Sequence, residues 1–200
     1  MQLCSECQLD DVKIHDISRR GERINNASFD ACEFIKVDLR EAILSNCVFL
    51  NCTFSECDLS GVSLENSRLS GDTFIQSKLV GINWTTANWA GGIRLPLSYC
   101  RCTLNHATYF GLNLEKWKWI DCVAVDVDFR EAVLRDVDFR GTDLRDSLFK
   151  HTQLQGADLS RAQNYRIAAS DNNILGAKFS MPEAMSLLEH LGIDLVDDYD

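Results

Sequence analysis

Proline and long apolar runs are scarce in this sequence. Only two of the 200 residues are proline, which excludes a proline-rich linker between domains. No apolar stretch approaches the roughly 20 residues that a membrane-spanning helix needs. Acidic residues stand near the N-terminus, where a signal peptide would have its apolar core. We therefore expect a cytoplasmic protein without membrane association, built as one domain or one short repeat array.

Groupings of residues that carry out chemistry are also missing. The four histidines are scattered, no Ser/His/Asp or Cys/His cluster is evident, and no glycine-rich phosphate loop occurs. Among nine cysteines the only C-x-x-C pair is Cys4 and Cys7, and no second pair completes a zinc site. Unpaired cysteines suit a reducing compartment. The sequence thus predicts a protein that is not an enzyme and holds neither metal nor cofactor.

Basic residues are the minority charge. The chain has 20 of them against 30 acidic residues, and its net charge is −10. This balance disfavours direct binding to nucleic acid, which normally needs a basic surface. The acidic excess is concentrated at the C-terminus, where residues 183–200 contain no lysine or arginine. The acids of that segment are Glu183, Glu189, Asp194, Asp197, Asp198 and Asp200.

What the sequence does have is a repeat of five residues. A large apolar residue, at what we term the inward position, recurs every five residues from Phe29 to Trp89 and from Tyr99 to Leu159, with only Ala124 small. Two residues earlier stands a mostly small residue, at the small position. Two inward residues separated by one outward residue indicate a short extended piece, and the three outward residues that follow indicate a corner. Repetition of this unit predicts a β-solenoid.

Most of the cysteines fit this frame. Seven of the nine fall at small positions, where free cysteine behaves as a small hydrophobic residue. These are Cys7, Cys32, Cys47, Cys52, Cys57, Cys102 and Cys122. We therefore interpret them as core residues.

The five-residue consensus, with Asp or Asn before Leu or Phe, resembles that of the pentapeptide-repeat family. The resemblance implies an all-β fold, a right-handed quadrilateral β-helix with four pentapeptides in each coil, so that residues 20 apart stack. Phe34, Phe54 and Phe74 would then form one column. We expect an N-terminal cap or irregular first coil over residues 1–23, the solenoid over 24–180, and a C-terminal helix with an acidic tail over 181–200.

The repeat is weakest at AGGIRLPLS, residues 90–98. Arg94 occupies an inward position, and Pro96 removes a donor from the backbone ladder. The spacing of five survives on both sides, so a distorted coil and a looped-out segment both fit. The segment is interpreted as a bend in the rod or, alternatively, as a loop that contacts a partner.

The repeat ends before the C-terminus. Ser180 and Glu183 have the spacing of a capping box, which predicts an α-helix that ends near Leu191, before Gly192. Such a helix would cap the open solenoid or form a homodimer. We favour dimerisation because the segment exposes many apolar residues and resembles the dimerisation element of Qnr-type members. The predicted interface is Ala184, Leu187, Leu188, Leu191, Ile193 and Leu195.

Function is indicated by resemblance to one subgroup of the family. GINWTTANW (81–89) and NYRIAASDNNILGAKFSMPEA (164–184) are similar to segments of the albicidin-resistance members, which belong with Qnr proteins among those that protect type II topoisomerases. The resemblance implies a mimic of duplex DNA that binds DNA gyrase and protects it from poisons such as quinolones or albicidin. The long projecting loops of Qnr proteins are missing, and the alternative is an interaction scaffold with an unrelated partner.

The acidic residues predicted to bind the partner fall into two groups. One group lies on the solenoid, where coils of 20 residues would align Asp38, Asp58, Asp138 and Asp158 on one wall, interrupted by Lys78 and Lys118. The other is the tail, with Asp194, Asp197, Asp198 and Asp200.

Overall fold

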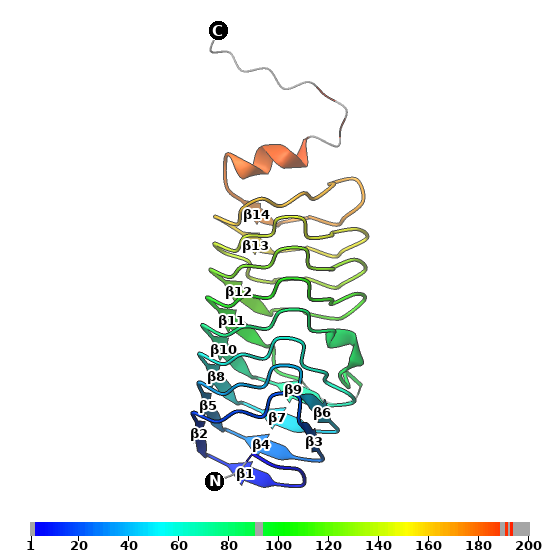
Figure 1. Cartoon of the computed structure of the whole chain (residues 1–200). Coiled ribbons are helices and arrows are strands. Elements are labelled where there is room, and N and C mark those ends of the chain that lie inside the picture. The colour runs from blue at the N-terminus through cyan, green and yellow to red at the C-terminus, as the bar shows by residue number, and fades with distance from the viewer. Residues whose placement is uncertain (1–2, 91–93, 189–190, 192, 194–200) are drawn as a thin grey trace.

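The chain winds into a parallel β-solenoid with four faces (Figure 1). The computed structural model describes residues 3–90, 94–188, 191 and 193. One face carries nine successive rungs, and about eight turns connect them. The rungs are Lys13, Glu33, Thr53, Thr73, Ser98, Lys118, Asp138, Asp158 and Lys178. The predicted fold class is confirmed, and the coil is already in register at Gln8, which pairs with Ser28.

The regular elements are short because every face is only a few residues wide. The strands are β1 (Gln8–Asp10), β2 (Lys13–His15), β3 (Arg23–Asn25), β4 (Ser28–Asp30), β5 (Glu33–Ile35), β6 (Ile43–Ser45), β7 (Val48–Leu50), β8 (Thr53–Ser55), β9 (Arg68–Ser70), β10 (Thr73–Ile75), β11 (Ser98–Cys100), β12 (Lys118–Ile120), β13 (Asp158–Leu159) and β14 (Lys178–Phe179). Two 3₁₀ helices, η1 (Trp84–Thr86) and η2 (Glu183–Leu187), complete the list.

The corners between faces are made by residues with left-handed backbone conformation. In the regular coils the residue two places after the inward residue adopts a positive φ, for example 50° at Asp11 and 55° at Asn26. Asp, Asn and Gly occupy this region more readily than other residues, which explains their abundance there. At Gly141, with φ of 71°, an added Cβ would also collide with the side chain of Asp121. The polar residues of the repeat thus turn the chain.

The inward side chains stack in columns along the rod. The ring centroids of Phe34 and Phe54 are 4.5 Å apart, and those of Phe54 and Phe74 are 4.8 Å apart. Both pairs are stacked nearly parallel, as the spacing of rungs in a sheet requires. The predicted column is confirmed, and Tyr99 continues it, 5.2 Å from Phe74.

One coil is five residues longer than the others. Phe74 pairs with Tyr99, so this coil has 25 residues instead of 20. The five extra residues lie between β10 and β11, and before β11 Leu95 is bonded to β9 through its N–H, which donates to the Ser70 hydroxyl at 3.0 Å. Residues 91–93, at the centre of the segment predicted to be irregular, lie outside the described residues.

The C-terminal α-helix is not formed as predicted. The residues described at this end form the 3₁₀ helix η2, with backbone bonds between residues three apart such as that from the Met185 N–H to the Pro182 carbonyl. The capping box fails because the Ser180 hydroxyl accepts a hydrogen bond from the Arg161 N–H of the preceding coil, 3.0 Å away. Gly192, the predicted terminator, lies outside the described residues. Within the described ranges, no helix has the length and apolar character that crossing a membrane requires.

Candidate protein-binding surfaces

The four predicted partner-binding aspartates of the solenoid do not share one wall. Asp38 and Asp58 belong to a face that continues through Lys78 and Thr103. Asp138 pairs with Asp158 on the neighbouring face, whose nine rungs are given above. The prediction of a single acidic wall is wrong because the five extra residues of the longer coil shift every later residue by one face. The sequence spacing of 100 between Asp38 and Asp138 no longer equals a whole number of coils.

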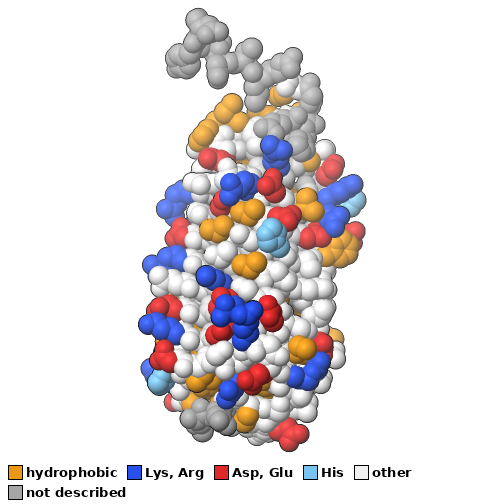
Figure 2. Space-filling model, in the orientation of Figure 1, with side chains coloured by type: hydrophobic (Ala, Val, Ile, Leu, Met, Phe, Trp, Pro, Cys, Tyr) orange, Lys and Arg blue, Asp and Glu red, His pale blue; other side chains and the backbone are white. Residues whose placement is uncertain are grey.

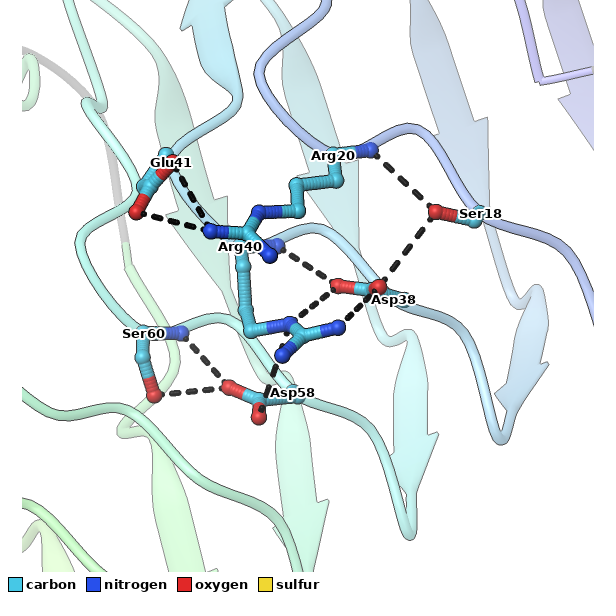
Figure 3. Close-up of polar contacts among 7 residues, drawn as sticks. All are labelled: Ser18, Arg20, Asp38, Arg40, Glu41, Asp58 and Ser60. Carbon is cyan, nitrogen blue, oxygen red and sulfur yellow. Dashed lines mark hydrogen bonds and ion pairs between the residues drawn. The ribbon is translucent and has the colours of Figure 1, made fainter.

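Asp38 is held by an arginine of its own strand segment (Figure 3). Arg40 Nε and Nη2 donate to the two carboxylate oxygens at 2.9 and 2.7 Å, and the Arg40 backbone N–H also donates to Oδ1. The hydrogen bonds from Arg40 hold the pKa of Asp38 well below its usual range. This bidentate pair forms because side chains two residues apart lie on the same face of an extended segment.

Asp58 lies one rung above Asp38 and shares the same arginine. Its Oδ1 accepts bonds from the Ser60 hydroxyl and backbone N–H, at 2.6 and 3.0 Å, while Oδ2 is 4.0 Å from Arg40 Nε. Arg20, which lies one coil earlier than Arg40, has its Nη2 3.3 Å from Glu41 Oε1 (Figure 3). Acids and bases therefore alternate on neighbouring rungs of this face.

The other face repeats the arrangement. Arg140 Nη2 is 2.7 Å from Asp138, and Lys178 lies 3.9 Å from Asp158. The same Asp-x-Arg pair recurs at Asp128–Arg130 and Asp143–Arg145. Figure 2 shows the outcome on one side of the molecule, where blue and red side chains are intermingled. These walls hold paired charges instead of a continuous acidic stripe.

The C-terminal end of the rod is the most apolar part of the described surface. Of the predicted interface, Leu188, Leu191 and Ile193 are exposed, whereas Ala184 and Leu187 are half-buried. Three further exposed residues belong to this end and were missed because they lie outside the predicted helix face: Leu175, Met181 and Met185. We term these residues the apolar end. Leu195 and the tail acids Asp194, Asp197, Asp198 and Asp200 lie outside the described residues.

The small positions assigned to cysteine are filled as the sequence predicts, whereas one other small position holds a carboxyl group, an exception to the repeat. Six of the seven cysteines assigned to them are buried, and Cys7 is half-buried. The exception is Asp72, which is fully buried although it carries a carboxyl group. In the sequence, only the position of Asp72 in the five-residue repeat indicates that its side chain is buried. In the described part of the chain, no group of three or more His, Cys, Asp or Glu side chains is arranged to hold a metal ion.

Comparison with known proteins supports the reading of the repeats. A family model for a pentapeptide repeat region matches residues 27–93, and one for pentapeptide repeats in eight copies matches residues 122–162. No curated protein matches the chain. Two trypsin-treated variants of QnrB1, a plasmid-mediated fluoroquinolone resistance protein, are similar in structure, each at 21% identity. The match to one variant has a TM-score of 0.71 and covers 96% of this chain and 99% of that variant. The match to the other has a TM-score of 0.63 and covers 95% of this chain and 98% of that variant. At this identity the likeness concerns the fold.

Proposed function

Because the chain belongs to the pentapeptide-repeat family, we propose that it is a non-catalytic binding protein whose partner is DNA gyrase, and that it protects gyrase from poisons such as quinolones or albicidin. We further infer that it acts in the cytoplasm as a homodimer joined at the apolar end, and that it does not itself bind nucleic acid. Its negative charge would replace that of DNA on a basic surface of the enzyme.

The observation that supports this proposal is a strongly acidic chain folded into a rod similar to that of QnrB1. The fold likeness extends over nearly the whole of both chains, and QnrB1 is a fluoroquinolone resistance protein. The net charge of −10 is unevenly placed, because residues 183–200 contain six acids and no basic residue. Residues 1–182 contain 24 acids and 20 basic residues, so residues 183–200 account for the larger part of the net negative charge. In a dimer joined at the apolar end, two tails would add their fields.

The second candidate is a scaffold with an unrelated partner. The intermingled charges of Figure 2 favour it, because a DNA mimic needs acids along a continuous face. The Asp-x-Arg pairs neutralise the wall acids locally, at Asp38 and at Asp138. The two candidates differ in their expected binding to gyrase. A DNA mimic should bind gyrase through charge, so that its affinity falls as the salt concentration rises, whereas a scaffold with an unrelated partner should not bind gyrase.

Direct binding to purified gyrase subunits tests the choice. The full-length protein is immobilised, and each subunit is passed over it at about 50 mM and about 300 mM salt, a range over which screening shortens markedly. We expect binding at low salt that weakens by at least tenfold at high salt. Absence of binding at low salt, with the immobilised protein shown to be folded, would replace the gyrase proposal by the scaffold.

A further inference from the structure

The C-x-x-C pair of the sequence lies at the first corner of the rod. Cys4 and Cys7 are the ends of a turn whose central residues are Ser5 and Glu6. The φ of Glu6 is 61°, and a positive φ is typical of the third residue of a tight turn. Two hydrogen bonds hold this turn on the next coil. The Glu6 N–H donates to the Asn25 carbonyl at 2.8 Å, and the Asn25 N–H donates to the Ser5 hydroxyl at 3.0 Å. The next coil thus fixes the corner that carries both cysteines.

This turn brings the two thiols within reach of each other. The ends of a four-residue turn lie within about 7 Å of each other, and a disulfide joins residues whose Cα atoms are about 4.4 to 6.8 Å apart. Cys4 and Cys7 are both free thiols. Burial raises the pKa of Cys7, and the neighbouring Cys4 thiol adds to this increase. The corner can therefore hold either two thiols or one disulfide without a change in the path of the chain.

The two cysteines differ from the others in their exposure to solvent. Cys4 is exposed and Cys7 is half-buried, whereas the six other cysteines at small positions are buried. The ninth cysteine, Cys100, is half-buried as well, but its neighbours on the adjacent rungs are Ile75 and Ile120. The first corner is thus the place where an accessible thiol has a second thiol beside it. An exposed thiol reacts first with a reagent in solution, and its neighbour can then displace the product.

We propose that Cys4 and Cys7 form a reversible dithiol–disulfide couple that exchanges with low-molecular-weight disulfides such as oxidised glutathione. In the first step the Cys4 thiolate attacks one sulfur of oxidised glutathione, forms a mixed disulfide and releases one glutathione thiol. In the second step the Cys7 thiolate attacks the Cys4 sulfur, closes the intrachain disulfide and releases the second glutathione thiol. The protein loses two hydrogen atoms, and oxidised glutathione gains them.

Two features of the corner favour the closed disulfide. The turn holds both thiols in place, so closing the ring costs little conformational entropy. Because burial raises the pKa of Cys7, its thiolate is a poor leaving group when the disulfide is attacked. The couple is independent of gyrase binding, since the first corner and the apolar end lie at opposite ends of the rod (Figure 1).

The test is equilibration of the full-length protein with mixtures of reduced and oxidised glutathione, followed by alkylation of free thiols, trypsin digestion and mass spectrometry. Trypsin releases residues 1–13 as one peptide, whose only cysteines are Cys4 and Cys7. We expect this peptide to lose two hydrogen atoms and to carry no glutathione. In urea the same mixture should give a ratio of disulfide to dithiol about tenfold lower, because the turn no longer holds the thiols together. A peptide that stays reduced, or equal ratios in the folded and the unfolded chain, would overturn the proposal.

Three serine variants assign the two steps. Cys7→Ser should keep one glutathione on Cys4, because no second thiol can displace it. Cys4→Ser should react with oxidised glutathione about tenfold more slowly than wild type, because Cys7 is half-buried. Cys100→Ser is the matched control, since Cys100 is also half-buried but lies outside the corner, and it should form the disulfide as wild type does. All three should retain the β-type circular dichroism spectrum. Cys7→Ser without bound glutathione, or loss of the disulfide in Cys100→Ser, would exclude this couple.

Discussion

At the scale of the residue, the inward positions determine whether the rod forms. Phe54 is buried and stacked between Phe34 and Phe74. Phe54→Asp would remove these contacts and place an unpaired charge in the core, at a cost of about 4 kcal/mol or more. We expect the variant to unfold, or to lose most of its resistance to urea, as followed by circular dichroism. Thr103→Asp is the control, since its outward position faces Lys78; unfolding of both variants alike would contradict this interpretation.

A second prediction at this scale concerns Asp72. Its carboxylate oxygens accept bonds from the Cys52 and Ser70 N–H groups, at 2.8 and 3.0 Å. Burial nevertheless raises its pKa from 3.8 to about 7. The folded protein keeps this proton to a higher pH than the unfolded chain does. The resulting stability is fully present below pH 4 and is lost as the pH rises to about 7, by about 4 kcal/mol at most.

Asp72→Asn isolates that contribution. Asn172 shows that an amide is accepted at a small position, since its Oδ1 accepts from the Thr152 N–H and its Nδ2 donates to the Phe149 carbonyl. The free energy of unfolding in urea is measured for both proteins at pH 5 and pH 8. We expect wild type to lose more stability than the variant between these values. Equal losses would show that Asp72 titrates as it does in the unfolded chain.

At the scale of the element, the two departures from the repeat have different origins. The columns were predictable because stacking depends only on spacing, as the Phe34 column shows. The face occupied by Asp138 was not predictable, because an insertion of five residues keeps the frame and changes only the face. The prediction of an α-helix at the C-terminal end of the rod was wrong for another reason. The Ser180 hydroxyl has a partner on the neighbouring coil, and a local capping pattern cannot reveal that competition.

The apolar end gives the prediction for the C-terminal element. Leu188 and Leu191 are 37% and 54% exposed, a large apolar exposure for two side chains three residues apart. If this end meets its own copy, Leu188→Glu with Leu191→Glu brings like charges together across the two-fold axis. Light scattering should show wild type at about 45 kDa, twice the chain mass, and the variant at about 23 kDa. A wild-type protein that is already monomeric would contradict the dimer.

At the scale of the whole molecule, we propose that long-range electrostatic attraction drives the binding of gyrase. Residues 183–200 hold six acids and no basic residue, so this segment should contribute most of the net negative field. Changing Asp194, Asp197, Asp198 and Asp200 together to Asn should weaken gyrase binding and reduce its salt dependence. The solenoid frame is untouched, so the unfolding transition should be unchanged. Unaltered binding by this variant would exclude the tail as the source of attraction.

The most direct test is gyrase supercoiling in the presence of a fluoroquinolone, with the full-length protein titrated in. We expect supercoiling to be restored at intermediate protein concentrations and gyrase to be inhibited at high concentrations, because the protein would compete for the DNA site. If the folded protein neither changes the fluoroquinolone effect nor inhibits the enzyme at any concentration, the protein does not protect gyrase.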